Sequence, residues 1–315
     1  MTRFWRIFWA VVIGAPLLTL SAWGLHDNPR LFVITLLNSL TLASLYFIVA
    51  SGFTLVFGLM RNVNLAHGSL YLLGGYVAFV VAEYTGWWIL ALAAGFAVAA
   101  LGGLLIQVLI LRRMQGEDLR QTLITIALAI VIADVLLWIF TGQVHQMDAP
   151  SWLQGPIRGI PLINAYSAYR LSLLGFGIVI GLFLWWLLNR TRVGMMIRAG
   201  VDDRGMLAAS GVNVQMVFAI TFAIGAGLAG FGGVIGAVEL SMAPGEDVRL
   251  LLASLIVVII GGMGSVVGAA LGAAILGLAE TYGLAYAPTY SVVFTFVILI
   301  LVLAFRPRGF LGRPA

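Results

Sequence analysis

The sequence predicts an all-α protein that crosses a membrane several times, as one domain over residues 1–315. Of its 315 residues, 62% are hydrophobic and only 9% are charged, and the mean hydropathy is +1.09. A soluble protein of this length cannot bury so much apolar surface, so the composition indicates a polytopic membrane protein. The 38 glycines agree with this, because small residues let helix backbones approach closely in lipid.

About ten stretches are predicted spans, since a membrane-spanning helix needs about 20 apolar residues. The first follows Arg3 and Arg6 like a secretory signal, but no small-residue cleavage site comes after it, which favours a span. The eighth and ninth are short and separated by "GGMGS", so they are either two spans or one bent segment. The predicted spans are 5–24, 31–58, 67–84, 87–111, 121–140, 170–189, 215–238, 250–264, 266–282 and 289–305.

The arginines predict the orientation. All 17 basic residues are arginine, and ten spans with a cytoplasmic N-terminus leave only Arg30, Arg158, Arg170 and Arg249 outside. The other 13 then lie in the cytoplasm, where short loops carry the excess of basic residues. Both termini are therefore predicted to be cytoplasmic. The net charge of +5 reflects this topology and does not indicate nucleic-acid binding.

Two hydrophilic stretches are long enough to be more than connectors. The outer one, 141–169, contains three prolines and Trp152 and is predicted to cap the outer mouth. The inner one, 190–214, has the charges and short helical pattern of an amphipathic helix at the cytoplasmic surface.

Enzyme chemistry is excluded by what the sequence lacks. Without lysine there is no Walker A motif, so ATP and Mg²⁺, if used, bind to another chain. Without cysteine there is no thiol nucleophile or thiolate metal ligand. His26, His67 and His145 have no metal-ligand spacing, and no GxSxG motif occurs. We therefore expect no catalytic residue, metal or cofactor in this chain.

Asp134 is the only carboxylate well inside a predicted span. A charge at that depth costs roughly 2.5–3.5 kcal/mol on insertion scales, so it is expected to be paired, hydrated or protonated. It is either an ion or proton site of a secondary transporter or, as we favour, a packing carboxylate bonded to a neighbouring helix. Glu83, Glu239 and Glu280 fall at the outer ends of predicted spans, and Glu246 and Asp247 fall in the loop that follows Glu239. All five are predicted to be solvated charges at the outer rim, with docking of a soluble partner as the alternative.

The polar stretch "NLAHGS" (64–69) lies between two apolar runs. It reads as a turn followed by a helix start, which Asn64 or Ser69 could cap while His67 packs beneath. The alternative is direct contact with a substrate, because a helix start attracts carboxylates.

The stretch "GFTLVFGLMRNVNLAHGSLYLLGGYVAF" (52–79) resembles the integral-membrane permeases of branched-chain amino acid ABC importers, of the LivH type. The matching positions are Gly52, Phe57, Gly58, Asn64, Ala66, His67, Gly68, Gly75 and Tyr76. Leu65 replaces the aromatic residue usual before Ala-His-Gly, and Gly75 replaces an alanine. Because 243–273 and 305–312 match as well, the resemblance runs from about Asn38 onward.

Residues 197–237 resemble the cytoplasmic loop by which these permeases dock on an ATPase. Gly205 departs from the family pattern, in which an acidic residue follows the Asp-Arg pair. The coupling residues implied by the resemblance are Arg198, Asp202, Asp203, Arg204, Gly211 and Asn213.

The resemblance implies the permease half of a bacterial inner-membrane importer, with the ten-helix fold of the vitamin B12 and ribose type. Its partners would be a second related permease, equal or different, two cytoplasmic ATPases that bind ATP and Mg²⁺, a periplasmic binding protein, and membrane lipid. Arg158 and Arg249, in predicted outer loops, are the expected docking residues for that binding protein.

The stretches 67–86 and 263–283 resemble each other, since each has a Gly-Ser pair at its second and third positions. Interrupted segments of this kind point to a transport path, and chance similarity in a chain rich in glycine and alanine is the alternative. The expected path residues are Asn38, Asn64, His67, Ser69, Gly264 and Ser265.

The substrate stays open among branched-chain amino acids, other amino acids, amides and urea. The rival interpretation is a stand-alone secondary transporter with Asp134 as its coupling site, and a channel is a distant third.

Overall fold

The computed structural model describes residues 28–60, 63–114 and 116–312. Within the described residues the regular elements are helices and one hairpin, β1 (Pro156–Ile157) paired antiparallel with β2 (Tyr166–Ser167). The α-helices are α3 (Pro29–Met60), α4 (His67–Thr85), α5 (Trp88–Leu105), α6 (Asp118–Phe140), α7 (Ala168–Arg190), α8 (Arg192–Asp202), α9 (Arg204–Ala209), α10 (Val214–Glu239), α11 (Glu246–Gly261), α12 (Val266–Tyr286) and α13 (Ser291–Phe305). A π-helical turn, Ile106–Ile110, and a 3-10 turn, Leu111–Met114, extend α5.

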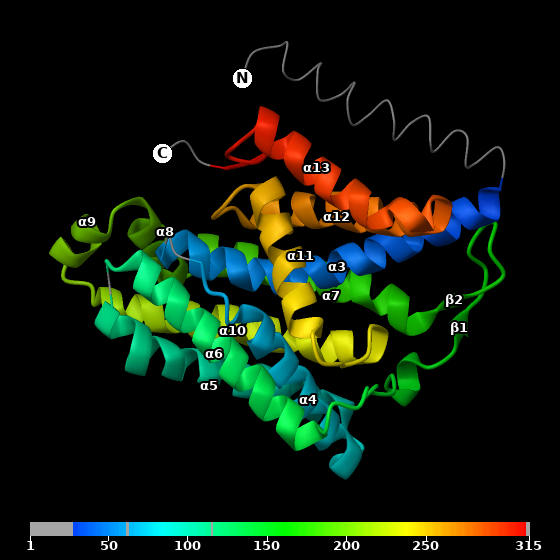
Figure 1. Ribbon diagram of the computed structural model, residues 1–315, viewed down its shortest axis with the longest axis horizontal. Helices are drawn as coiled ribbons and strands as arrows, with labels where there is room; N and C mark the ends of the chain where they lie inside the picture. The colour runs from blue at the N-terminus through cyan, green and yellow to red at the C-terminus, as the bar shows by residue number, and fades with distance from the viewer. Residues whose placement is uncertain (1–27, 61–62, 115, 313–315) are drawn as a thin grey trace.

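The long helices form a bundle in which most members run roughly along one axis (Figure 1). The short helices α8 and α9 lie at one end of this bundle, which we call the α8–α9 end. The strands β1 and β2 lie at the opposite end, which we call the hairpin end. Helix α11 crosses the others in the middle of the bundle (Figure 1).

Seven of the described helical segments are long and apolar enough to cross a membrane. They are α3, α5 with its extension, α6, α7, α10, α12 and α13 with the turn before it. Helices α4 and α11 are not among them, and the first predicted span, 5–24, lies outside the described residues. The prediction of an all-α polytopic bundle is confirmed, and ten is only an approximate number of spans.

The region from 250 to 282 is two helices and not one bent segment. Helix α11 begins at Glu246, earlier than predicted, and has only 16 residues. A turn through Gly262 and Gly264, both with positive φ, separates it from α12. Since α11 is short and crosses the bundle, hydropathy alone could not place it.

Six helix starts carry a side chain whose oxygen accepts a backbone N–H of the first turn, which has no partner inside the helix. The caps are Asn28 for α3, Ser167 for α7, Thr191 for α8, Asp203 for α9, Asn213 for α10 and Ser265 for α12. Three of these caps, Thr191, Asp203 and Asn213, lie in the inner segment 190–214. The segment therefore forms two short helices, where one was predicted.

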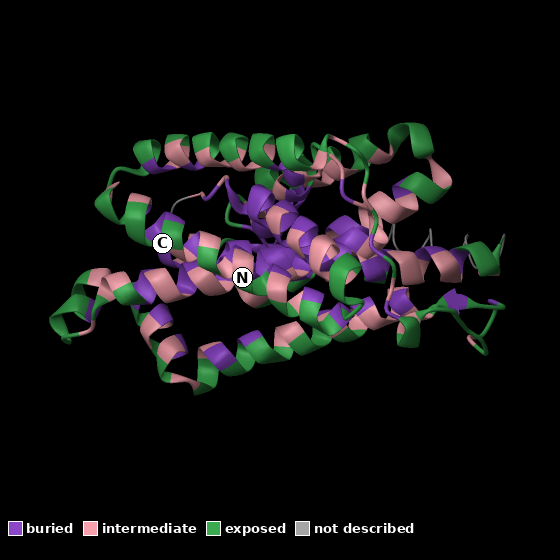
Figure 2. Ribbon diagram, turned by 90° about the horizontal axis from the view of Figure 1, so that it is seen from below, coloured by how far each residue is buried: buried purple, intermediate pink, exposed green. Residues whose placement is uncertain are grey.

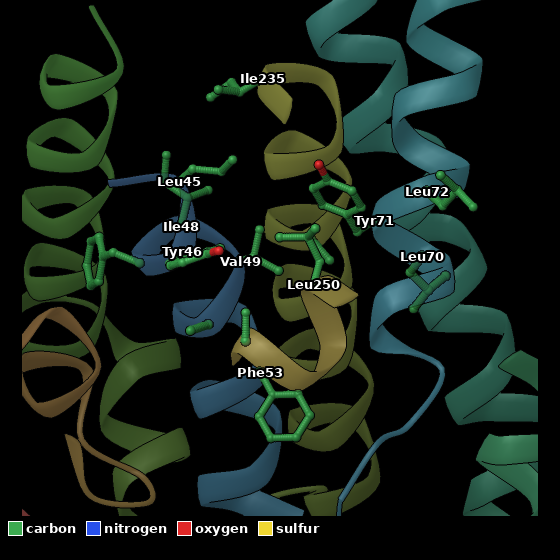
Figure 3. Close-up of a cluster of buried hydrophobic side chains, with 14 of the residues drawn as sticks. Leu45, Tyr46, Ile48, Val49, Phe53, Leu70, Tyr71, Leu72, Ile235 and Leu250 are labelled. Carbon is green, nitrogen blue, oxygen red and sulfur yellow. The ribbon is translucent and has the colours of Figure 1, made fainter. Parts of the chain in front are cut away.

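Helix α10 is the centre of the bundle and packs against α3, α4 and α5. Its glycines face small residues of all three neighbours, so the backbones touch: Gly225 meets Gly52 of α3, and Gly230 meets Gly74 of α4. Buried residues concentrate in this middle region, and the outer helices expose most of their surface (Figure 2). Buried side chains of α3, α4, α10 and α11 gather there in one cluster (Figure 3).

The outer segment 141–169 packs against the hairpin end of α10. A backbone bridge joins His145 to Met242, and the Met147 N–H donates to the Ala237 carbonyl at 3.0 Å. Trp152 lies edge-on to the buried Trp88. The segment is thus an ordered part of the bundle, in keeping with the predicted cap.

The α4–α10 contact predicts a sharp difference between two glycine substitutions. A Cβ at Gly233 would collide with the Tyr71 carbonyl oxygen, whereas a Cβ at Gly175 of α7 meets nothing within 4 Å. We expect Gly233→Ala to lower the melting temperature of the purified protein, since overpacking costs about 1–3 kcal/mol. Gly175→Ala should leave it unchanged or raise it. Equal melting temperatures for both variants would contradict this packing.

Candidate functional site

Helix α4 begins in the interior of the bundle and not at its end. His67, its first residue, is fully buried, and its Nε2 lies 3.0 Å from the carbonyl oxygen of Val49. Val49 precedes the end of α3 at Met60 by about 16 Å along the helix, at 1.5 Å per residue. Helix α3 therefore ends near the α8–α9 end, whereas α4 begins in the middle of the bundle.

Helix α11 begins at the same place. Gly68 lies directly against the Asp247 backbone, where a Cβ would collide with the Asp247 carbonyl oxygen. The Ser69 hydroxyl lies 3.4 Å from Asp247 Oδ2 and 3.1 Å from the Ala129 carbonyl oxygen of α6. Two helix starts and α6 thus converge on Ser69 and Asp247.

A cavity of about 420 Å³ lies beside this meeting point, between α4, α6 and the start of α11. Its walls are mostly apolar, and Tyr76, stacked on Phe140, forms part of them. Asp134 and Asp247 are both among the residues that line it. Apolar walls with a few convergent polar groups are typical of a small-molecule site. The principal apolar lining residues are Leu72, Ile126, Ile130, Leu137, Val248 and Leu251.

Asp247 was missed as a site residue by the sequence analysis. The prediction that Glu246 and Asp247 lie in a solvated loop is wrong: both are in the first turn of α11, and Asp247 is only 7% exposed. The stretch "PGEDVRLLL" carried the signal, since turn residues and then acidic residues before an apolar run are typical of a helix start.

The predicted caps of α4 are also wrong. Its N-cap residue is Ala66, which makes no side-chain cap hydrogen bond. Asn64 Oδ1 accepts the Ala66 N–H at 3.1 Å and so holds the turn before the helix. The Ser69 hydroxyl bonds to neighbouring helices instead, because it lies inside the first turn.

The six predicted path residues lie in separate places. Asn64 and His67 are buried near the start of α4, and Ser69 contacts Asp247, a residue that lines the large cavity. Asn38 accepts hydrogen bonds from Tyr166 and Arg170 at the hairpin end. Gly264 lies beside Gly58, and Ser265 caps α12, at the far end of α11 from Ser69. Their role in transport stays a prediction.

Asp134 is exposed on α6 and lines the cavity. Within the described residues it has no hydrogen-bond or ion-pair partner. The interpretation of a packing carboxylate bonded to a neighbouring helix therefore finds no support in this geometry, and Asp134 is free to face a ligand.

Arg249 also lies in α11 and not in a loop, which corrects the sequence prediction. Its guanidinium pairs with Glu246 at 3.3 Å and with Glu280 of α12 at 3.2 Å. The Tyr46 hydroxyl of α3 donates to Glu280 at 2.6 Å. This network links α3, α11 and α12, so Arg249 stabilises the packing of these three helices.

Arg158 is the exposed basic residue of the hairpin turn, and no partner is found for it in the described part of the chain. Arg170, by contrast, pairs with Glu239 at 3.0 Å. Of the two residues predicted to dock a binding protein, Arg158 is therefore the one with a free charge.

The predicted coupling residues gather at the α8–α9 end. Arg204 Nη2 donates to the Leu59 carbonyl oxygen at 2.7 Å, and its guanidinium lies over the Phe218 ring. Arg198 donates to Asn189 at 3.0 Å. Leu207 of α9 is buried against Leu59 and Phe218. These contacts fix α8 and α9 on α3 and α10.

The remaining predicted coupling residues shape the turns of this segment. Asp203 and Asn213 are caps, Asp202 ends α8, and Gly211 adopts a positive φ with open space around it. The exposed side chains of the pair include Met195 and Met206.

A family model described as "Branched-chain amino acid transport system / permease component" matches residues 35–303. The chain belongs to this family. The expected recognition is thereby confirmed, and the matched range includes both "NLAHGS" and the inner segment.

Three relatives show how far the similarity extends. The high-affinity branched-chain amino acid transport system permease protein BraD of Pseudomonas aeruginosa is 31% identical, over 89% of this chain and 95% of BraD. LivH of Escherichia coli K12 is 30% identical, over 90% of this chain and 96% of LivH. The autoinducer 2 import system permease protein LsrC of Salmonella paratyphi B is 29% identical, over 79% of this chain and 71% of LsrC.

The contact of His67 with α3 generates a prediction about stability. His67→Ala removes a fully buried ring that lies edge-on to Phe53 and reaches the Val49 carbonyl. We expect a loss of about 2–5 kcal/mol and a lower melting temperature. His67→Gln keeps a donor near Nε2 and should retain most of the stability. Similar melting temperatures for the histidine and alanine forms would contradict the anchoring role.

Proposed function

We propose that this chain is one permease subunit of an ATP-driven importer that moves branched-chain or related amino acids across the bacterial inner membrane. The α8–α9 pair is the single observation that carries the proposal. It is fixed to α3 and α10 by Arg204 and Leu207, yet exposes Met195 and Met206. A surface that is rigidly attached and apolar suits docking of a separate ATPase, which would bind ATP and Mg²⁺.

The arginine distribution supports an orientation with the α8–α9 end and both termini in the cytoplasm. Arg190, Arg192, Arg198 and Arg204 lie in or beside the α8–α9 pair, whereas the hairpin turn carries only Arg158. In this orientation the hairpin end faces the periplasm, where a substrate-binding protein would deliver its ligand.

Broad apolar faces support the other proposed neighbours. Helices α6 and α13 are among the least buried spanning segments, and they expose large residues such as Leu123, Trp138, Val293 and Phe296. We assign these faces to membrane lipid and to a second related permease. The chain itself performs no catalysis in this arrangement and needs no cofactor of its own.

The substrate assignment follows the names of the relatives. BraD and LivH are branched-chain amino acid permeases, which favours amino acids. LsrC serves autoinducer 2 import, so membership of the family leaves room for other small solutes, including amides or urea.

A stand-alone secondary transporter is the second candidate, because Asp134 and Asp247 face one cavity. Uptake into vesicles separates the two. An importer driven by ATP keeps working when an ionophore collapses the proton gradient, whereas a proton-coupled carrier stops.

Met206 provides a test of ATPase docking. Its side chain is 67% exposed, and Met206→Asp would bury an unpaired carboxylate in the proposed contact. We expect co-purification of the ATPase to fall about tenfold, equivalent to about 1.4 kcal/mol. Met206→Leu keeps an apolar side chain and should bind normally. Normal ATPase binding by the aspartate variant would refute docking on α9.

Arg158 provides a test of the periplasmic contact. We expect Arg158→Glu to slow uptake at low salt while the permease–ATPase complex still assembles, because charges at an interface rim mainly change the association rate. The defect should shrink at high salt, where such charges are screened. Arg30→Glu reverses another exposed charge predicted on the same side and is the matched control. Equal uptake by both variants at low salt would remove Arg158 from the docking surface.

A further inference from the structure

The charged residues that line the cavity between α4, α6 and α11 are both acidic. Its volume of about 420 Å³ lies within the range of roughly 300–1,000 Å³ that is usual for small-molecule sites. The described residues that line it include two carboxylates and no basic residue. Such a lining attracts cations and repels anions.

Asp247 stands where two helix starts meet. The positive ends of α4 and α11 favour a negative charge at this point, and the Ser69 hydroxyl lies 3.4 Å from Asp247 Oδ2. Both features stabilise the carboxylate of this buried side chain, which is only 7% exposed. The Asp247 carboxylate therefore already occupies the position at these helix starts to which a substrate carboxylate would be attracted.

Asp134 supplies the second negative charge from the facing helix. It has no partner among the described residues and lines the same cavity as Asp247. A carboxylate inside a spanning helix is costly unless it serves a pathway or finds a partner. An ammonium group between the two acids would provide that partner.

We propose that this cavity is a recognition site for the ammonium group of an amino acid with an apolar side chain. Asp247 and Asp134 bind the ammonium group, and the walls of Leu72, Ile130, Val248 and Leu251 receive the hydrocarbon side chain. The site therefore selects amino acids over urea and amides, which carry no positive charge. The inference deepens the proposed function and rests on it.

Three probes of equal hydrocarbon shape test the charge preference: L-leucine, 3-methylbutylamine and 4-methylpentanoate. Their contacts with the purified permease–ATPase complex can be measured by saturation-transfer NMR without the binding protein. We expect leucine and the amine to give signals and to compete with each other, whereas the acid gives none. An acid that competes as well as the amine overturns the proposal.

Two conservative variants locate the site. Asp247→Asn keeps the shape and the Ser69 contact but removes the charge, and Asp134→Asn changes an exposed residue that has no hydrogen-bond or ion-pair partner among the described residues. Each should weaken binding of leucine and the amine by about tenfold or more, the usual effect of losing a charge-assisted hydrogen bond. Glu83→Gln neutralises an exposed acid on α4 outside the cavity and is the control.

The outcomes separate this inference from the proposed function. If Asp247→Asn fails to fold, Asp134→Asn alone decides, and unchanged binding by it overturns the proposal. Wild-type uptake that depends on ATP, together with equal binding of amine and acid, leaves the importer in place and removes only the ammonium site. Uptake abolished by an ionophore in the presence of ATP removes the importer instead.

Discussion

The close approach of α10 to α3, α4 and α5 is the contact on which the rest of the structure depends. Glycines on both sides of each contact bring the backbones together, because dispersion forces in lipid reward only close packing. The α4–α10 contact runs through Gly74 and Gly75, so the position of α4 along the bundle is fixed. Because α4 is fixed in this position, its first residue lies in the interior of the bundle. Helix α11 also begins there and meets the start of α4.

Helices α4 and α11 both begin inside the bundle. Backbone N–H groups at a helix start need acceptors, and none is available from lipid. The first turn of α11 carries charged side chains on two of its faces. Glu246 and Arg249, three residues apart and so on one face, join the network with Glu280. Asp247, on another face, turns towards Ser69 and the cavity. One helical turn therefore holds both a closed ion-pair network and an open negative site.

The sequence predicted the bounds of most spanning helices well. It did not predict where in the bundle a helix such as α4 or α11 begins. Apolar length located α3, α6, α7, α10 and α12 within a few residues, because hydropathy reports how much chain can lie in lipid. It does not report where a helix begins relative to its neighbours. Asp247 was consequently placed in an outer loop, and Arg249 with it, although "PGED" marked a helix start. Asn64 and Ser69 were misread as caps for the same reason, since their partners come from segments far along the chain.

Helix α3 contacts both regions to which a function is proposed, the α8–α9 pair and the start of α4. At its end the Leu59 carbonyl accepts the Arg204 guanidinium of α9, and in its interior the Val49 carbonyl meets His67, the first residue of α4. Hydrogen bonds along an α-helix fix its rise, so the helix moves as a stiff rod over this distance. A displacement of α8 and α9 that keeps the Arg204 contact must therefore reach the start of α4. Ser69 and Asp247 lie at that start, so we expect a movement of the α8–α9 end to reach the wall of the cavity.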